Sequence, residues 1–319
     1  MSKNILGIDV AKQKIDVALI VEGATRTNQF DNSLAGFTLL QAWLESLRLG
    51  QVHACLEATG NYGDGLALFL HAAGHFVSVV NPLRLKGYAT AQMQRNKTDP
   101  ADARLIADFC LTQALVQWLP PAAQVAELQA LTRRLGVLEG MLQMERNRRA
   151  TAPEKTKPSL ARMIAALEQE IAQLKTNIKD HFEQNPALQE QQELLQSIPG
   201  IGEKTARMLL SEIDFARYDS ARQVAAYAGV TPQKRQSGTS LKQTSLSKLG
   251  NGRIRKGLYF PAIVAQQHNK IIRDFAARLA QNGKTSMQII CAAMRKLLHI
   301  AFGVLKNNSP FNPNLAFSS

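Results

Sequence analysis

Two aspartates three residues apart, Asp99 and Asp102 in "NKTDPADARLIADF", stand where a helix is expected to begin. Asp is a favoured N-cap, Pro100 suits the first helical position, and acids in the first turn complement the helix dipole. Residues i and i+3 also share one helix face, so both carboxylates can contact one metal ion. The motif predicts a helix start, and a metal site would need further acids from elsewhere in the chain.

Two more acids lie at the ends of predicted strands. Asp9 follows apolar residues in "LGIDVAK", and Glu57 does so in "ACLEATGNY". An acid at the end of a core strand is costly unless it is solvated, paired or bound to a cation. If the two strands are neighbours, these carboxylates meet at one sheet edge, where Asp99 and Asp102 can join them. Carboxylates without His or Cys select Mg²⁺ or Mn²⁺, and two such ions can activate a phosphodiester.

The elements that must position these acids occupy residues 1–118. Their hydrophobic patterns predict three strands, a helix, a strand, a helix, a strand and final helices. The strands are expected within residues 4–10, 14–23, 25–32, 51–58 and 75–82. This order predicts an α/β domain with a mixed sheet. The tightly joined opening strands argue against a purely parallel dinucleotide-binding fold, and no GxGxxG follows the first strand.

Residues 119–185 form a second predicted region with leucine and isoleucine at heptad spacing. The two series are Leu128, Leu131, Leu135, Leu138 and Leu142, and Leu160, Ile164, Leu167, Ile171, Leu174 and Ile178. The segment "TAPEKTKPS" between them contains two prolines and predicts a turn. The spacing predicts two coiled-coil helices, which can fold back as a hairpin or pair with another copy of the chain.

Residues 186–319 are expected to be mostly helical. "LLQSIPGIGEKTARMLLSEI" resembles a helix-hairpin-helix, in which Gly200 and Gly202 allow a phosphate to approach the next helix N-terminus. An ordinary turn between two helices explains the same segment. Residues 229–262 are rich in Gly, Ser, Thr and cations and predict long loops.

The positive charge is concentrated in this third region. The chain has a net charge of +13, and residues 186–319 carry 18 Lys and Arg against 7 Asp and Glu. No acid occurs between Asp219 and Asp274, although ten Lys or Arg do. A basic stretch is often only a solvated face, but one this long favours a polyanion, and nucleic acid above all.

Other features bear on compartment. Cys55, Cys110 and Cys291 form no CxxC pair, which argues for a reducing compartment and against a zinc site or disulfide framework. The N-terminus runs directly into a strand pattern, so no signal peptide is expected. The apolar residues 287–305 include Arg295, Lys296 and His299, which favour a buried or amphipathic helix over a membrane span. We therefore expect a cytoplasmic protein without membrane contact.

The acidic motifs, in the order D…E…D–x–x–D, resemble the ribonuclease H-like superfamily and its RuvC-type nucleases. "GIDVAK", "LEATGNY", "NKTDPADA" and "PGIG" followed by "KTA" are together similar to the DEDD transposases of the insertion sequence 110 family, the bridge-RNA-guided recombinases. The resemblance covers essentially the whole chain. It implies a RuvC-like catalytic domain at 1–118, a coiled-coil hairpin at 119–185 and a basic helical transposase domain at 186–319.

The resemblance also implies a site and partners. Asp9, Glu57, Asp99 and Asp102 would bind Mg²⁺, or else Mn²⁺, and Ser237 in "KRQSGTS" would be the nucleophile that forms a phosphoserine with DNA. A noncoding bridge RNA would pair with donor and target DNA, and the subunits would form a dimer that assembles into a tetramer on DNA. Nucleic-acid contacts are expected at Gly200, Gly202, Lys204, Lys234, Arg235, Lys242, Lys248, Arg253, Arg255 and Lys256.

From the residues alone, the serine is less well defined. Ser237 lies in a basic segment without a GxSxG elbow, and Ser240, Ser245 and Ser247 offer similar hydroxyls. Lys234, Arg235 and Lys242 can bind a phosphate and stabilise charge in the transition state. Two alternatives stay open. One is a RuvC-like metal-dependent junction nuclease that uses water, and the other is a nucleic-acid-binding scaffold without activity.

Overall fold

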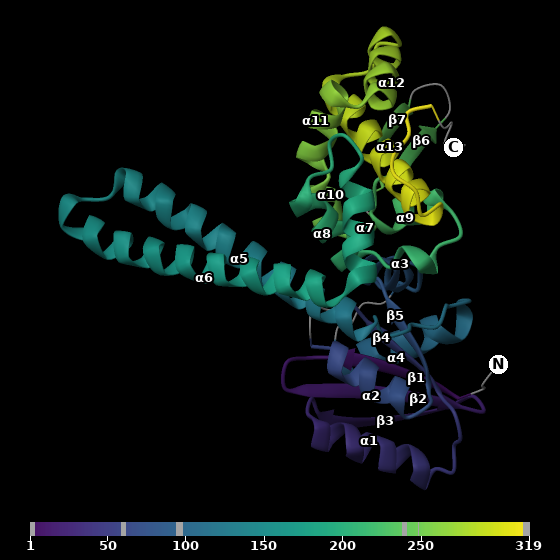
Figure 1. Cartoon of the computed structure of the whole chain (residues 1–319). Coiled ribbons are helices and arrows are strands. Elements are labelled where there is room, and N and C mark those ends of the chain that lie inside the picture. Colours follow the sequence, from purple (N-terminus) through teal and green to yellow (C-terminus); the bar gives the residue numbers. More distant parts are fainter. Residues whose placement is uncertain (1–3, 59–61, 94–97, 238–240, 248, 315–319) are drawn as a thin grey trace. The chain divides into compact units, whose positions relative to one another are not determined.

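The computed structural model describes residues 4–58, 62–93, 98–237, 241–247 and 249–314. The chain divides into two compact units, Met1–Pro120 and Pro121–Ser319 (Figure 1). The first is a mixed α/β unit, and the second is mostly helical. The three-part division at residues 118 and 185 stays a prediction, since both later regions lie in the second unit and share one hydrophobic core.

A five-stranded sheet in the order β3-β2-β1-β4-β5 forms the centre of the first unit. Its strands are β1 (Ile5–Val10), β2 (Lys14–Val21), β3 (Ala24–Asp31), β4 (His53–Glu57) and β5 (Phe76–Val80). The β1–β2 and β2–β3 pairs are antiparallel, whereas β1–β4 and β4–β5 are parallel. The predicted mixed sheet is therefore confirmed.

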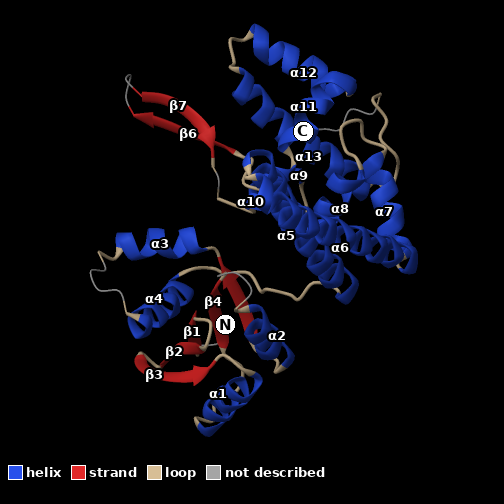
Figure 2. Ribbon diagram, turned by 90° about the vertical axis from the view of Figure 1, so that its left-hand side faces the viewer, coloured by secondary structure: helices blue, strands red, loops and turns tan. Residues whose placement is uncertain are grey.

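Helices cover both faces of this sheet (Figure 2). One face packs against α1 (Leu34–Ser46) and α2 (Asp64–Ala72) through a core that includes Leu6, Ile8, Leu40 and Leu70. The other face packs against α3 (Pro82–Ala91) and α4 (Asp99–Thr112) through Ile5, Cys55, Leu85 and Ile106. Strands β1 and β4 are apolar on both faces because helices cover both.

Two long helices begin the second unit. They are α5 (Ala123–Thr151) and α6 (Lys157–Gln184), which lie side by side and project from the rest of the unit (Figure 1). The heptad residues Leu128, Leu135, Ile171 and Ile178 are buried in the core that the two helices share. The predicted helical hairpin is present, and supercoiling of its helices stays a prediction.

The remaining elements of this unit are α7 (Pro186–Gln196), α8 (Glu203–Glu212), α9 (Ala221–Tyr227), β6 (Pro232–Ser237), β7 (Leu241–Leu246), α10 (Gly252–Gly257), α11 (Tyr259–His268), α12 (Lys270–Gln281) and α13 (Ser286–Lys306). Helix α13 packs against α7, α9, α11 and α12. By length and composition α13 is apolar enough to cross a membrane, yet half of its most apolar window is buried in the unit and it carries Arg295 and Lys296. It is a core helix.

The expectation of long loops at residues 229–262 is wrong for most of that segment. Its backbone forms the antiparallel β6–β7 hairpin, with Ser237 opposite Leu241, and then α10 and the start of α11. The segment contains few apolar residues, so it lacks the alternation of apolar and polar residues that predicts a strand.

Candidate active site and nucleic-acid interface

Strand pairing brings Asp9 and Glu57 to one edge of the sheet. In the parallel β1–β4 pair, Ile8 is opposite Leu56, so the next residue on each strand is an acid. Asp9 is half-buried, and Glu57 is the last residue of β4. Because parallel strands end at the same edge, both carboxylates lie at the carboxyl end of the sheet, as the sequence predicted.

The first turn of α4 carries Asp99 and Asp102. Thr98 is the N-cap, and its carbonyl accepts the Asp102 N–H at 2.8 Å. The expectation that Asp99 caps the helix is therefore wrong by one residue. Both acids still occupy the first turn, where the helix dipole favours negative charge.

Gly7 allows α4 to approach β1 closely. A Cβ added at Gly7 would lie 2.2 Å from the Ala107 nitrogen and 2.3 Å from the Ala103 oxygen, distances that no real Cβ adopts. Only glycine can occupy this position while the helix backbone rests on the strand. This close contact between α4 and the strand that ends near Asp9 holds the first turn of α4 close to Asp9.

The electrostatics of Asp9 record the convergence of the four acids. Burial, followed in order by repulsion from Asp102, Asp99 and Glu57, raises its pKa to about 6. Asp16 also contributes. A carboxyl that is surrounded by other carboxylates resists ionisation, and a bound cation relieves the repulsion. The structure thus places Glu57, Asp99 and Asp102 within electrostatic range of Asp9.

Two residues of this cluster were missed by the sequence analysis. Asp16 lies directly opposite Asp9 in the antiparallel β1–β2 pair, is 4% exposed, and accepts the Gln29 side-chain amide at 2.8 Å. The Nζ of Lys14 lies 2.7 Å from Oδ2 of Asp99 and 3.1 Å from Oδ2 of Asp16. The short turn between β1 and β2 was a sufficient signal, because opposite residues of a hairpin share one face.

The donor set fits a hard divalent cation in chemistry and in charge. All the acids offer oxygen, with no His or Cys among them, which suits Mg²⁺ or Mn²⁺. Within the described ranges, no group of three or more His, Cys, Asp or Glu side chains has converged to metal-binding geometry. Asp99 is turned toward Lys14. Metal binding by all four acids thus requires side-chain rotation, which the exposed position of Asp99 permits.

The predicted nucleophile lies in the second unit. Ser237 is the last residue of β6, at the end of the β6–β7 hairpin. The side chains of Lys234, Arg235, Ser237 and Lys242 fall outside the described part of the structure, as does residue Lys248. Their expected contacts stay predictions, and only the backbone of the strands bears on them.

The turn between α7 and α8 gives its two glycines different surroundings. Gly200 has φ +106°, and a Cβ there would lie 2.6 Å from the Ala265 Cβ of α11. Its backbone therefore accommodates α11, a packing role. Gly202 is the N-cap of α8 with open space around its missing Cβ, so a phosphate contact is still predicted there. Lys204 forms an ion pair with Glu139 of α5.

The three cations of α10 also differ. Arg253 and Lys256 are exposed, whereas Arg255 is half-buried and its guanidinium donates to the Ala228 carbonyl at 3.4 Å. Asn251 caps the helix by accepting the Arg253 N–H at 2.9 Å. This arrangement leaves Arg253 and Lys256 available to a phosphate and assigns Arg255 to packing.

A buried ion pair fixes α10 to the helices behind it. The Asn251 amide donates to Oε2 of Glu212 at 2.8 Å, and Nε of Arg133 donates to Oε1 of Glu212 at 2.9 Å. Glu212 is 6% exposed. Since a buried carboxylate needs partners, this network fastens the cap of α10 to α5 and α8.

Comparisons with known proteins identify relatives of this chain. A family model of DEDD transposases matches residues 6–158, and a model described as transposase IS116/IS110/IS902 family matches residues 192–277. The pilin gene-inverting protein of Moraxella bovis is 34% identical over 320 residues, 99% of each chain. The protein of that name from Moraxella lacunata is also 34% identical, with the same coverage. The transposase for insertion sequence element IS1111A of Coxiella burnetii is 25% identical over 83% of this chain and 79% of its own.

Proposed function

The chain belongs to the IS110 family of transposases, and from this premise we propose that it cleaves DNA at its acidic site and rejoins the strands through Ser237. The observation that carries the proposal is the position of Asp9 and Glu57 at one sheet edge, with the first turn of α4 supplying Asp99 and Asp102, whose repulsion helps to raise the pKa of Asp9. Such a cluster is unfavourable in a protein with no cation to bind, and phosphodiester chemistry uses this arrangement.

Asp9, Glu57 and Asp102 would hold the divalent cation, with Asp99 joining after release from Lys14. When bound, the ion supplies charge that polarises the scissile phosphate and stabilises the departing oxygen. Mg²⁺ is the expected ion, and Mn²⁺ is the expected substitute. The acids of β1 and β4 define a rigid edge, whereas those of α4 adjust by side-chain rotation.

Ser237 would perform the covalent step. Its Oγ attacks the phosphorus, the P–Oγ bond forms and the bond from phosphorus to the 3′ oxygen breaks. The serine proton passes to solvent, and the departing oxygen takes up a proton to become a 3′-hydroxyl. A 3′-hydroxyl of the partner DNA then attacks the phosphoserine and releases the serine. Each phosphodiester broken is replaced by another, so strand exchange needs no external energy source.

The partners are proposed on the same basis. We infer a bridge RNA that pairs with donor and target DNA, with a helix-hairpin-helix-like turn and α10 contacting the backbones. The cytoplasm, where the DNA lies, is the proposed location. We also infer a homo-oligomer built through the α5–α6 hairpin. Val137, Met141 and Met144 support it, because they form an exposed apolar row on α5 at helical spacing of 4 and 3.

Inversion of a DNA segment is a second candidate outcome of the same chemistry. The relatives that match at 34% over the full length are named pilin gene-inverting proteins. Exchange between two sites in opposite orientation on one molecule inverts the segment between them. Plasmids that carry the element's ends in direct or inverted orientation separate the outcomes, since excision and inversion give products of different restriction pattern.

The test of the covalent step uses wild type, Ser237→Ala and Asp102→Asn with guide RNA and labelled DNA in Mg²⁺. A nicked substrate blocks rejoining, and detergent denaturation follows. Wild type should leave a protease-sensitive band shift that both variants lack. Adduct formation by Ser237→Ala would assign another hydroxyl. Cleavage by wild type without an adduct would favour the hydrolytic junction nuclease, and absence of metal-dependent cleavage would favour the inactive scaffold.

A further inference from the structure

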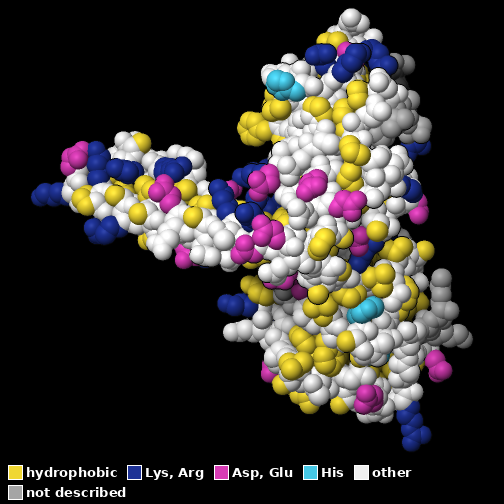
Figure 3. Space-filling model, in the orientation of Figure 1, with side chains coloured by type: hydrophobic (Ala, Val, Ile, Leu, Met, Phe, Trp, Pro, Cys, Tyr) yellow, Lys and Arg dark blue, Asp and Glu magenta, His cyan; other side chains and the backbone are white. Residues whose placement is uncertain are grey.

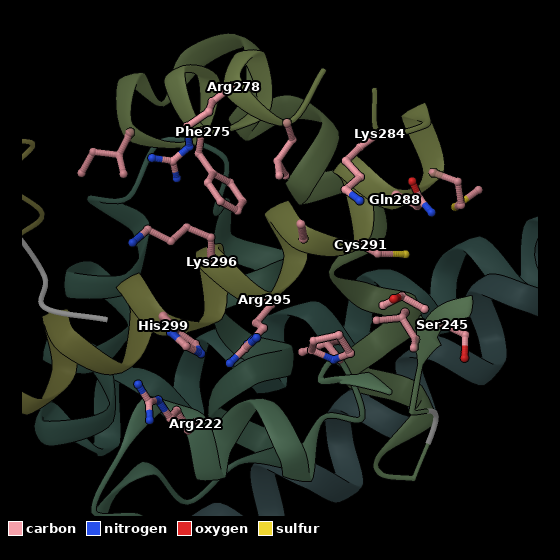
Figure 4. A pocket seen from close by; sticks show the side chains of 18 of the residues that line it. Arg222, Ser245, Phe275, Arg278, Lys284, Gln288, Cys291, Arg295, Lys296 and His299 are labelled. Carbon is pink, nitrogen blue, oxygen red and sulfur yellow. The ribbon is translucent and has the colours of Figure 1, made fainter. Parts of the chain in front are cut away.

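A cavity of about 890 Å³ lies in the second unit between α9, α12, α13 and the β6–β7 hairpin (Figure 4). Its size falls within the range of protein pockets that enclose a whole organic ligand. None of its lining residues belongs to the acidic site or to the cations expected from the sequence to contact nucleic acid. The cavity therefore needs an explanation of its own.

Cations dominate the charge of this cavity. Its lining includes Arg222, Arg278, Lys284, Arg295 and Lys296. The one acid in the lining is Asp274, and Nζ of Lys270 lies 2.8 Å from its Oδ2. In the space-filling view, Lys and Arg gather over the α12 end of the unit, whereas the α5–α6 hairpin carries both signs (Figure 3). The cavity thus has a strongly positive lining that suits an anion.

Two polar atoms in the lining have no hydrogen-bond partner within the described part of the chain. They are Nε of Arg295 and Nε2 of His299, and both atoms are buried. A buried polar atom without a partner costs stability unless a ligand or water satisfies it. Arg222, Arg295 and His299 lie together on one side of the cavity (Figure 4). This side offers several donors to one acceptor-rich group.

The state of His299 agrees with a positive potential there. Burial, followed by the charges of Arg295, Lys296 and Arg222, lowers its pKa to about 4. The imidazole is therefore neutral at pH 7, and its protonation is opposed by three cations on α13 and α9. A phosphate group placed among them would relieve this repulsion and complete the hydrogen bonds.

The opposite side of the cavity combines apolar side chains with the cations Arg278 and Lys284 (Figure 4). Phe275 and Leu279 of α12 and Met287 of α13 lie in its lining, and the Arg278 guanidinium lies 5.5 Å from the centre of the Phe275 ring. Aromatic rings and guanidinium planes are the surfaces on which unpaired bases stack. A duplex keeps its bases inside the stack, so it presents only phosphates to such a surface.

We propose that this cavity binds an unpaired nucleotide of a nucleic-acid strand, with its base against Phe275 and Leu279 and its phosphate among Arg222, Arg295 and Lys296. The occupant is single-stranded DNA or RNA, which share this chemistry. A nucleotide matches three features of the cavity together: its volume, the apolar surface of Phe275 and Leu279, and the cations with unsatisfied donors.

The position of the cavity relates it to the proposed chemistry. Pro232, Thr244 and Ser245, at the base of the β6–β7 hairpin, form part of the lining. Five residue steps of β6 separate Pro232 from Ser237, about 17 Å at roughly 3.3 Å per residue. The relation between the cavity and the cleavage site at Ser237 rests on the proposed function, whereas nucleotide binding in the cavity does not require any reaction.

The test measures binding in the Ser237→Ala background, where no covalent step is expected to occur. Fluorescence anisotropy follows labelled single-stranded DNA, single-stranded RNA and a DNA duplex of one sequence. Arg222→Ala with Lys296→Met removes two cations of the cavity. The charge-matched control, Arg162→Ala with Lys175→Ala, removes two exposed cations of α6. Arg222→Lys with Lys296→Arg preserves the charge, and thermal melting by circular dichroism verifies folding.

The cavity variant should bind a single strand at least tenfold more weakly and flatten its salt slope by about 0.7 per lost phosphate contact. The control and the charge-preserving variant should stay within twofold of the parent. The DNA and RNA arms identify which strand is bound. Equal affinity of the cavity variant and the control for both strands would overturn the proposal, as would an equal loss of single-strand and duplex binding.

A second measurement tests the base directly. 2-Aminopurine is quenched when it stacks, so scanning it along the preferred oligonucleotide should reveal one position that responds to the protein. Phe275→Leu should abolish that response and leave the salt slope unchanged. Quenching that persists in Phe275→Leu would place the base elsewhere. A wild-type cleavage rate in Ser237→Ala would refute the serine mechanism and leave these binding results unaffected.

Discussion

The ammonium of Lys14 lies 2.7 Å from a carboxylate oxygen of Asp99 and joins the second strand of the sheet to the first turn of α4. Lys14 also contacts Asp16, so a positive charge lies within the acidic cluster. Hydrogen bonds to both carboxylates raise the pKa of Lys14. Because this ammonium contacts Asp99, an expected metal ligand, we expect Lys14 to compete with a divalent ion for that carboxylate.

Replacing Lys14 by Met should destabilise the metal-free protein and increase its response to Mg²⁺. Without the ammonium, repulsion between the carboxylates lowers the stability of the folded protein. Mg²⁺ binds only the folded state and relieves this repulsion, so it should stabilise the variant more than it stabilises wild type. Differential scanning fluorimetry in EDTA and in Mg²⁺ measures both effects. Lys12→Met, an exposed change in the same turn, is the control. The competition idea is lost if both variants show the Mg²⁺ response of wild type.

Replacing Asp9 by Asn should stabilise the metal-free protein at pH 8. The pKa of Asp9 is about 6 in the folded chain against 3.8 as the reference, so ionisation costs stability as pH rises between these values. The cost is fully present above pH 6 and absent below about pH 3.8. It is at most about 3 kcal/mol, and less because a half-exposed carboxylate is screened.

The advantage of Asp9→Asn should thus shrink as pH falls from 6 to 4, which urea unfolding at several pH values measures. Addition of Mg²⁺ should favour wild type, because the variant lacks a ligand. Cleavage should be abolished, as it should be for Glu57→Gln. A pH-independent difference in stability between wild type and variant would contradict repulsion as its cause.

Replacing Gly7 by Ala should cost roughly 3 kcal/mol or more, since the added Cβ meets the α4 backbone rather than a movable side chain. Relief of that clash moves α4, so metal binding should weaken as well. Gly87→Ala in α3 is the matched control, because nothing lies within 4 Å of its Cβ. That change should stabilise by about 0.5–1 kcal/mol. Urea midpoints compare the two, and a mild effect at Gly7 would refute the close packing.

The cations of α10 should separate into two kinds. Arg253→Ala with Lys256→Ala should leave stability nearly unchanged and flatten the salt dependence of DNA affinity by about 0.9 per lost phosphate contact. Arg255→Ala should lower the melting temperature, because its hydrogen bond to Ala228 and its packing against Gly229 are lost. Anisotropy titrations at several salt concentrations and thermal melts distinguish them. An unchanged salt slope in the double variant would mean that this face does not contact DNA.

The sequence by itself determined the features that depend on local periodicity. Alternation and apolar runs located all five strands of the first unit, and the heptad leucines located the two helices of the hairpin. The acids at strand ends were recognisable because charge is rare beside fully buried residues such as Ile8 and Leu56. Their order along the chain also indicated the family. These signals lie within a few residues of one another, so no contact had to be known in advance.

Only the tertiary structure decided which groups meet across the chain. Strand register placed Asp16 opposite Asp9, and the approach of α4 to Gly7 placed Asp99 within reach of Lys14. The same kind of packing assigned Gly200 to α11 and assembled a cationic cavity from four elements. Such contacts are set by the energy of packing distant segments together, which depends on the shape of both partners. A hydrophobic pattern specifies which face is buried, and the structure alone specifies what it is buried against.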